Sequence, residues 1–302
     1  MPVDTFTSYM VPKEESLIPE DSSISAGLHH CLAVKQDGSI DCWGYDEFGI
    51  VSDTPPGDDF IAVAGGSYHS LALKQDGSIV AWGNDGYNQV SAAPEGKNFV
   101  AISAGKFHSV ALHQNGSIVA WGIDLHNQVS DSPTDTDFVA VSAGDFHCLA
   151  LKQDGSLVAW GRDGEWADYP VSCTPKNKGF VSISAGRFHS FAVCEDGSIA
   201  AWGRNTYFQV SKAPEGNDFV AVSAGGSSSL ALKKDGSLVA WGDDDFNQVS
   251  DIPLGNDFIS MSVGMFHSIA LSENGDITVW GLNTYKQVSP RQDRLTYSTN
   301  SQ

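Results

Sequence analysis

The chain has 302 residues, of which 41% are hydrophobic, and it carries a formal net charge of −20. A chain of this length and apolar content can bury a large core. Because the negative charge repels phosphate backbones and anionic lipid headgroups, nucleic acids and membrane surfaces are excluded as expected partners.

The first residues, MPVDTFTSYM, contain neither the basic segment nor the apolar segment of a secretory signal peptide. No run approaches the roughly 18 apolar residues of a membrane span. These features favour a cytoplasmic protein, and export by another route stays open as an alternative. We expect residues 1–20 to form an N-terminal extension before the repeated part of the chain.

A Trp-Gly pair recurs along the chain at intervals of 39 residues, with one interval of 42. A period near 40 residues is typical of solenoids, propellers and other repeat architectures. The chain is therefore predicted to contain seven units over residues 21–290, followed by a polar C-terminal tail at 291–302. The seven tryptophans are Trp43, Trp82, Trp121, Trp160, Trp202, Trp241 and Trp280.

Each unit is predicted to contain four short strands, as residues 99–130 illustrate. A first strand, FVAIS, is followed by a second, HSVAL, and an Asn-Gly or Asp-Gly turn leads to a third, SIVAWG. A polar loop precedes a short fourth strand, NQVS, and a proline-containing turn returns to the next unit. Asp-Gly and Asn-Gly pairs are typical of type I′ hairpin turns, in which both central residues have positive φ.

The second and third strands are apolar at consecutive positions, as in LAL and IVAW. A strand with one wet face would alternate, so both faces of these strands are expected to be covered. Antiparallel hairpins covered on both faces and repeated seven times predict an all-β fold, a seven-bladed β-propeller with four antiparallel strands per blade.

The pattern G-x-F/Y-H-S-L-A-L-x-x-D-G-x-I/V-x-x-W-G is matched in all seven units. It resembles the repeat of the regulator of chromosome condensation family, whose members form seven-bladed propellers. The short, uniform units are most similar to compact bacterial members, which include a secreted β-lactamase inhibitor protein. The resemblance implies guanine-nucleotide exchange on a small GTPase as one alternative function. Inhibition of a secreted enzyme such as a β-lactamase, and a structural role in a larger assembly, are two others.

One face of such a propeller is predicted to be uniform and the other diversified. The Asp-Gly turns and the return turns share a face and barely change between units. On the other face, one variable position follows each unit's glycine and another lies five residues after each tryptophan. The first set is Leu28, Ser67, Lys106, Asp145, Arg187, Gly226 and Met265, and the second is Phe48, Tyr87, His126, Glu165, Tyr207, Phe246 and Tyr285.

All variation in unit length falls in one loop of unit four, residues 161–172, which also carries Trp166 and Tyr169. Aromatic side chains on loops around one rim are typical anchors of protein interfaces. We therefore predict a non-catalytic scaffold or inhibitor, a monomer on its own, that binds a protein partner through this face. Packing of the rim aromatics under their own loops is the alternative. The predicted contact residues are Trp166, Tyr169, Phe48, Tyr87, His126, Tyr207, Phe246, Tyr285, Lys106, Asp145, Arg187 and Met265.

Six histidines share one position of the units, which Ser228 occupies in unit six. One histidine per blade is too widely spaced for a shared tetrahedral metal ion, so each is expected to fix its own turn through a hydrogen bond. No calcium-loop or nucleophile motif accompanies them, and no catalytic residue, metal or cofactor is predicted. The six are His30, His69, His108, His147, His189 and His267.

The five cysteines form no C-x-x-C pair, and most fall in apolar strand segments. Free, buried thiols are expected. A disulfide between Cys31 and Cys42 across one hairpin is the alternative.

Overall fold

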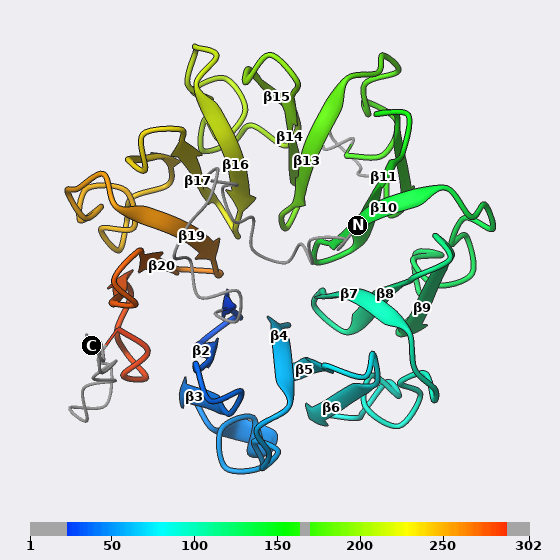
Figure 1. The fold of residues 1–302 in the computed structure, drawn as a ribbon. Coiled ribbons are helices and arrows are strands. Elements are labelled where there is room, and N and C mark those ends of the chain that lie inside the picture. Colours follow the sequence, from blue (N-terminus) through cyan, green and yellow to red (C-terminus); the bar gives the residue numbers. More distant parts are fainter. Residues whose placement is uncertain (1–22, 164–169, 289–302) are drawn as a thin grey trace, which may run out of the picture.

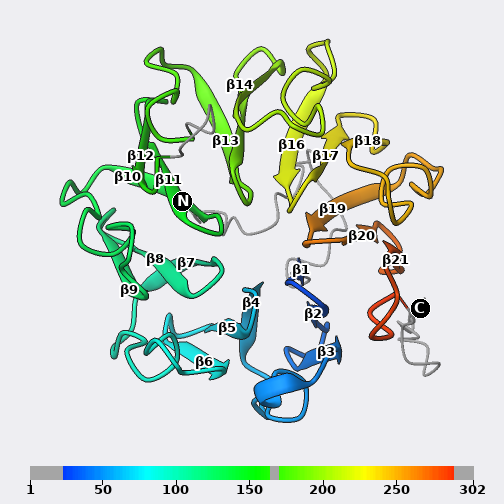
Figure 2. The same cartoon turned by 180° about the vertical axis from the view of Figure 1, so that it is seen from behind.

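The computed structural model of the chain describes residues 23–163 and 170–288. Within these ranges, seven antiparallel sheets stand like blades around a central axis (Figures 1 and 2). The first strand of each sheet contacts the first strand of the next, and β1 of the first blade contacts β19 of the last. The predicted seven-bladed, all-β propeller is confirmed.

Each blade contains three strands in chain order, and a single 3-10 helix, η1 (Glu47–Gly49), follows the first blade among the described residues. The strands are β1 (Ile24–Ala26), β2 (His30–Val34) and β3 (Ile40–Gly44); β4 (Phe60–Gly65), β5 (His69–Lys74) and β6 (Ile79–Gly83); β7 (Phe99–Ala104), β8 (His108–His113) and β9 (Ile118–Gly122); β10 (Phe138–Ala143), β11 (His147–Lys152) and β12 (Leu157–Gly161); β13 (Phe180–Ala185), β14 (His189–Cys194) and β15 (Ile199–Gly203); β16 (Phe219–Ala224), β17 (Ser228–Lys233) and β18 (Leu238–Gly242); and β19 (Phe258–Val263), β20 (His267–Ser272) and β21 (Ile277–Gly281).

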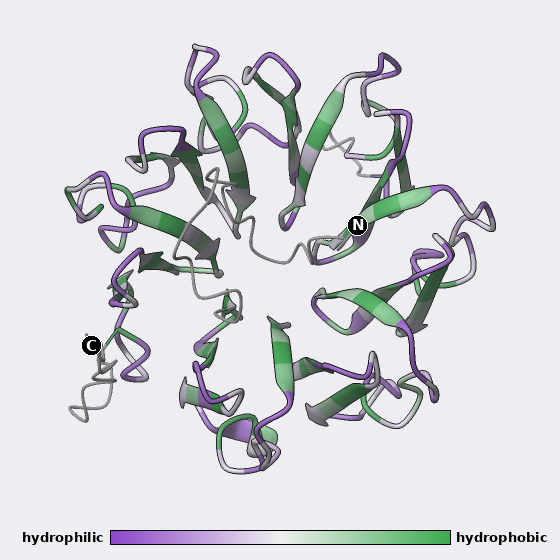
Figure 3. Ribbon diagram, in the orientation of Figure 1, coloured by the Kyte–Doolittle hydropathy of each residue, from purple (hydrophilic) through white to green (hydrophobic). Residues whose placement is uncertain are grey.

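The apolar core lies between blades rather than within them. The middle strand of a blade is buried at five successive positions in β5, β8 and β17, because neighbouring blades cover both of its faces. One core cluster joins Val110 and Leu112 of blade three to Val141 and Ala150 of blade four. Figure 3 shows hydrophobic residues along the strands and hydrophilic residues in most loops. No described helix is long and apolar enough to cross a membrane.

The expected fourth strand is absent from the described blades, where the NQVS segment forms a tight turn instead. In blade three, the N–H groups of Val129 and Ser130 donate to the Asp124 carboxylate at 2.7 and 3.0 Å. Asn127 has a φ of 59°, outside the strand region. The carbonyl of Gln128 accepts an indole N–H from the next blade. The backbone N–H and carbonyl groups that a strand would pair with a neighbouring strand therefore form hydrogen bonds inside the turn and with the next blade.

The hairpin turns also differ from the expected type I′ geometry. In blade two, positive φ is found at Gly77 (80°) but not at Asp76. The Asp76 carboxylate instead accepts the N–H and the hydroxyl of Ser78 at 2.9 and 2.6 Å. This is the longer hairpin in which a left-handed glycine follows a type I turn. Glycine is also required by space, because a Cβ on Gly77 would lie 2.4 Å from the backbone nitrogen of Asn98.

The tryptophan of each blade is bonded to the blade before it. The indole N–H of Trp121 donates to the carbonyl of Gln89 at 3.0 Å, 32 residues earlier, and the other blades repeat this bond. Trp43 makes the equivalent bond to Gln287 at 2.9 Å, from the first blade to the last. Among the described residues no strand crosses this seam, and the tryptophan bond across it matches the tryptophan bonds of the other six joints.

Five of the six histidines that share this repeat position link neighbouring blades, rather than each fixing its own turn as predicted. Neither ring nitrogen of His267 has a hydrogen-bond partner among the described residues. The Nε2 atom of His69 lies 2.7 Å from the hydroxyl of Ser109 in the next blade. Three other histidines meet a serine in the same way, and His108 meets Cys148. Burial lowers the pKa of His30, His69, His147 and His189 to about 3, and that of His108 and His267 to about 4. All six imidazoles are therefore neutral parts of the blade interfaces.

Blade six lacks the histidine and therefore its bond to the next blade, and a substitution should restore that bond. Ser228 and Ser268, the two side chains that would be joined, have no hydrogen-bond partner at Oγ. A Cβ on Gly65 would lie 3.1 Å from Nε2 of His30, so the residue facing a histidine at this position must be small. In blade seven the equivalent residue is the larger Val263.

We expect Ser228→His alone to destabilise the protein, because the imidazole meets Val263. In a Val263→Ala background, Ser228→His should raise the free energy of unfolding by about 1 kcal/mol through the new hydrogen bond. Urea unfolding of both single variants and the double variant measures this coupling. A Ser228→His effect of the same sign and size in both backgrounds would contradict it.

All five cysteines are free, and the alternative disulfide is not formed. The thiol of Cys31 lies 3.7 Å from the carbonyl of Gln287, while that of Cys42 lies 3.4 Å from the carbonyl of Ile50. Three of the five thiols are buried, whereas Cys173 is exposed. Burial raises the pKa of Cys42 to about 12.

The expected extension at 1–20 and tail at 291–302 lie outside the described residues, as do Trp166 and Tyr169.

Candidate protein-binding face

The loops divide between two faces as the sequence predicts. On one face, the N–H of Asn84, which follows the third strand of blade two, donates to the carbonyl of Tyr68 in the preceding loop at 2.8 Å. On the opposite face, the N–H of Phe99 donates to the carbonyl of Gly77 at 3.0 Å, which ties the hairpin turn to the return turn. The loops between first and second strands and those after third strands form what we call the aromatic face.

Most rim aromatics pack against an aromatic side chain of the next blade. Tyr87 meets Phe107 edge to face with ring centroids 5.1 Å apart, and four equivalent pairs recur around the face. The partner rings, which come directly before the blade histidine, also stack on one another in places, with centroids 5.5 Å apart between Tyr68 and Phe107. The aromatic belt, as we define it, comprises Phe48, Tyr87, His126, Phe246 and Tyr285 together with His29, Tyr68, Phe107, Phe146, Phe188 and Phe266.

The belt residues that come directly before the blade histidine were not predicted as part of a site. They occupy the position where the repeated motif shows F or Y. Their recurrence was the signal, but a fixed motif position reads as structural. Ser227 holds this position in blade six, so the neighbouring Tyr207 is not paired in the same way.

Packing does not remove the belt from the surface. Phe48 and Tyr87 remain 49% and 48% exposed, and Tyr207, Phe246 and Tyr285 are also exposed. His126 is half-buried. Single exposed aromatics are common, but several exposed aromatics gathered on one face are typical of interaction surfaces. The predicted alternative of packing is therefore seen for five rim side chains, which still present apolar surface to solvent; their role as binding anchors stays a prediction.

Part of the belt surrounds a hollow of about 460 Å³. Four aromatic side chains from blades one to three form much of its wall, and a carboxylate and an amide lie in the lining. Such a volume is within the range of pockets that accept a ligand or the side chains of a partner. The lining residues are Glu47, Phe48, Tyr68, Asn84, Gly86, Tyr87 and Phe107.

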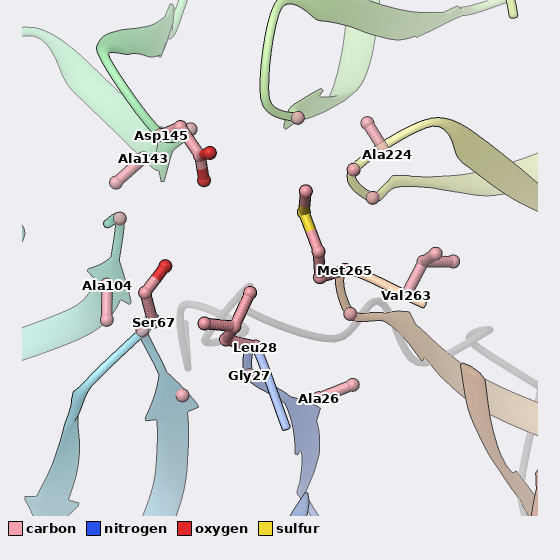
Figure 4. Close-up of a pocket in the computed structure, with 18 of the residues that line it drawn as sticks. Ala26, Gly27, Leu28, Ser67, Ala104, Ala143, Asp145, Ala224, Val263 and Met265 are labelled. Carbon is pink, nitrogen blue, oxygen red and sulfur yellow. The ribbon is translucent and has the colours of Figure 1, made fainter. Parts of the chain in front are cut away.

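The residues at the variable position after each unit's glycine lie in two places: some line the central channel, and others lie on the aromatic face. Asp145 and Met265 line the channel beside Leu28 and Ser67, as Figure 4 shows, in a space of about 80 Å³. Lys106 lies outside that lining, with its Nζ 5.4 Å from the ring centroid of Phe107. Two of the predicted contact residues, Asp145 and Met265, thus belong to the channel rather than to the belt.

Solved structures resemble the chain in fold. The CRINKLY WD40 ectodomain of the Arabidopsis thaliana receptor kinase ACR4 has a TM-score of 0.71 at 24% identity, covering 87% of this chain and 94% of that one. The ectodomain of the Physcomitrella patens receptor kinase CR4 gives 0.70 at 22% identity, over 86% and 72%. Prp20p of Saccharomyces cerevisiae, described with its binding to Gsp1p and histones, gives 0.66 at 20% identity, over 93% and 87%. No curated protein is significantly similar in sequence.

A repeat described as the Regulator of chromosome condensation (RCC1) repeat matches the chain once in every blade. The matched segments are 22–50, 60–89, 99–128, 138–165, 180–209, 219–248 and 258–287. They include the strands, the blade histidine or its serine replacement, the tryptophan, and the carbonyl to which the next tryptophan donates in most blades. Together they span more than half of the sequence, so the chain belongs to the regulator of chromosome condensation (RCC1) repeat family.

Proposed function

We propose that this protein is a non-catalytic interaction module, a scaffold or an inhibitor, that binds a protein partner through the aromatic face. The aromatic belt is the observation that carries the proposal. Its side chains are held in place by contacts between blades and remain exposed. Because they are already ordered, little side-chain entropy is lost when a partner covers them.

The proposed mechanism is docking of a preformed surface. Apolar side chains of the partner enter the hollow between Phe48 and Tyr87, and the neighbouring rim excludes water from the contact. Tight packing between the blades keeps the spacing of these anchors fixed. The bound surface of the partner is then either masked, which inhibits it, or held in place, which makes the propeller a scaffold.

Trp166 and Tyr169 belong to this proposal through their place in the sequence between β12 and β13, and they lie outside the described residues. Guanine-nucleotide exchange remains a prediction of the family resemblance alone. Release of labelled nucleotide from small GTPases, measured with and without the protein, would test it separately.

We expect the double variant Phe48→Ala/Tyr87→Ala to bind its partner at least about 30-fold more weakly, since two aromatic anchors are lost. The partner is first identified by pull-down from the source cells and then titrated in purified form by calorimetry. Leu254→Ala is the matched control, because Leu254 is 97% exposed and lies in a return turn on the opposite face.

If the aromatic variant binds the partner as tightly as the native protein does, the partner does not bind through this face. Equal weakening by Leu254→Ala would place the contact on the uniform face. Circular dichroism of both variants establishes whether the propeller remains folded, so that a loss of binding can be assigned to the surface.

A further inference from the structure

The hollow of about 460 Å³ at blades one to three has aromatic walls that stand at different angles. Tyr68 and Phe107 are nearly parallel, with 14° between their ring planes. The ring of Phe48 stands at 88° to that of Tyr68, and the ring of Tyr87 stands at 61° to that of Phe107. Because all four rings line one space, a group that enters the hollow contacts aromatic rings in more than one orientation.

The only charged side chain in the lining of the hollow is a carboxylate, that of Glu47. Its Oε2 atom accepts the hydroxyl of Tyr45 at 2.7 Å, and no basic group of the described residues forms an ion pair with it. The amide oxygen of Asn84 is already used, because it accepts hydrogen bonds from the N–H of Gly86 and the side chain of Gln89, both at 2.9 Å. The lining therefore offers one unpaired negative charge among aromatic rings.

Two carboxylates and one ammonium group lie close to the lining without belonging to it. Asp46 and Asp85 directly precede lining residues or lie next to them in sequence, and each accepts two backbone N–H groups of its own turn. The Nζ atom of Lys106 lies 5.4 Å from the ring centroids of both Phe107 and Phe146, between blades three and four. A further cation is therefore expected at the end of the hollow away from Phe107.

The rest of the aromatic belt shows that its rings accept cations. The guanidinium group of Arg162 lies 5.4 Å from the centroid of Phe146, and that of Arg187 lies 5.2 Å from Phe188. Among the described residues, by contrast, no cationic group lies over three of the four rings of the hollow, those of blades one and two. These three rings have the same surroundings in the belt but no cation of the chain's own.

The charge of the remaining chain does not oppose a cation at the hollow. All lining residues belong to the range 23–163, which is described without a gap. The undescribed stretches 1–22, 164–169 and 289–302 together carry eight acidic and three basic residues. Since the whole chain has a net charge of −20, its field attracts cations rather than repelling them.

We propose that the hollow binds a trimethylated lysine side chain of the protein partner. This inference rests on the proposed function and specifies one of the side chains that enter the hollow. A cation is attracted to the negative face of an aromatic ring, and quaternary ammonium groups are recognised in proteins by cages of such rings. The carboxylate of Glu47 adds a direct attraction between opposite charges.

Methylation suits the small number of hydrogen-bond acceptors in the lining. An unmodified ammonium group carries three N–H donors and a guanidinium group carries five, and a donor that leaves water without a new acceptor is costly. The side-chain acceptors that remain are Oε1 of Glu47 and the hydroxyls of Tyr68 and Tyr87. A trimethylammonium group has no N–H donor and needs none of them. A lysine also brings a chain that can cover the neighbouring belt, which free choline cannot do.

The test measures fluorescence anisotropy of three labelled peptides that differ at one position, flanked by glycine and serine. That position holds trimethyllysine, unmodified lysine, or the neutral analogue in which carbon replaces the ammonium nitrogen. We expect the native protein to bind the trimethyllysine peptide at least about fivefold more tightly than either of the others. The neutral analogue has the same shape, so the ratio isolates the effect of the charge. Equal binding of the charged and neutral peptides, or no detectable binding of the trimethyllysine peptide, would overturn the proposal.

Two variants assign the binding to the hollow. Phe48→Leu keeps an apolar side chain without the ring, and Glu47→Gln removes the negative charge. Each should weaken binding of the trimethyllysine peptide at least about threefold. Phe208→Leu is the matched control, because Phe208 also has a φ of 61° and is 55% exposed but lies outside the hollow. Circular dichroism shows whether each variant is folded. If folded Phe48→Leu and Glu47→Gln both bind the peptide like the native protein, the site is wrong.

Free choline and the purified partner separate the other outcomes. Choline that binds as tightly as the trimethyllysine peptide would overturn the choice of a lysine side chain. If Phe48→Ala/Tyr87→Ala loses the partner while the native protein does not distinguish trimethyllysine from its neutral analogue, the aromatic face stands and the cation site is wrong. If the native protein prefers trimethyllysine but Phe48→Ala/Tyr87→Ala retains the partner fully, the cation site stands and the proposed function is wrong.

Discussion

Acidification from pH 7 to pH 5 is expected to unfold the protein. Six histidines are buried at the blade interfaces, and burial lowers the pKa of each to about 3 or 4, against 6.5 for an accessible imidazole. Between these values the unfolded chain binds protons that the folded chain excludes, so stability is complete above about pH 6.5 and falls as the pH drops. Each histidine costs about 2 kcal/mol at pH 5, and six cost about 12 kcal/mol, which is comparable to the whole stability of a typical domain.

The measurement is urea unfolding as a function of pH. The free energy of unfolding should fall by up to about 8 kcal/mol per pH unit near pH 5, the slope of about six protons. His69→Ser, which copies the arrangement found at Ser228, should lower this slope by about one proton. His126→Ser, at the half-buried rim position, should change the slope much less. A slope below about two protons would mean that the imidazoles are not held neutral by the fold.

A methyl group added at Gly105 is expected to cost about 3 kcal/mol of stability. A Cβ there would lie 2.2 Å from the carbonyl oxygen of Gly144 in the next blade and 2.5 Å from the ring of His108. The nearest obstacle is backbone that also forms the channel wall, so it cannot turn aside as a flexible side chain would. Gly105→Ala therefore forces two blades apart.

Gly86→Ala is the matched control for this substitution. Its nearest neighbour would be the side-chain oxygen of Asn84 at 3.2 Å, and Gly86 has no positive φ. We expect its free energy of unfolding to stay within about 0.5 kcal/mol of the native value. Similar stability of the two alanine variants in urea would show that the blades tolerate a wider channel.

The propeller could be predicted from sequence because its signals are local and repeated. The consecutive apolar positions of strands such as His69–Lys74 indicate burial on both faces, and the Trp-Gly period counts the blades. The prediction of a fourth strand was wrong because the backbone groups of that segment form other hydrogen bonds. The Gln128 carbonyl bonds to an indole 32 residues away, and local capping by Asp124 replaces strand pairing.

The candidate site was predicted only where variation was visible along the chain. The rim position that includes Tyr87 stood out because it changes from unit to unit. Its packing partner Phe107 did not, since its importance depends on the neighbouring blade. The contact of Lys106 with the ring of Phe146 was equally hidden, because the two residues are far apart in sequence and meet only when consecutive blades are placed side by side.

In the part of the chain that the structure describes, the seam between the first and last blades is held by non-covalent contacts alone. In the described residues, the bond from Trp43 to Gln287, the bond from Ala26 to Ser262 and the packing of β1 on β19 hold this joint, and no strand crosses it. The other six joints repeat the tryptophan bond and the packing of first strands, and they are also bridged by the continuous chain. Tension applied between blades one and seven is therefore resisted, within the described residues, by these contacts and not by a covalent connection. A covalent cross-link between blades one and seven would close the ring of blades covalently.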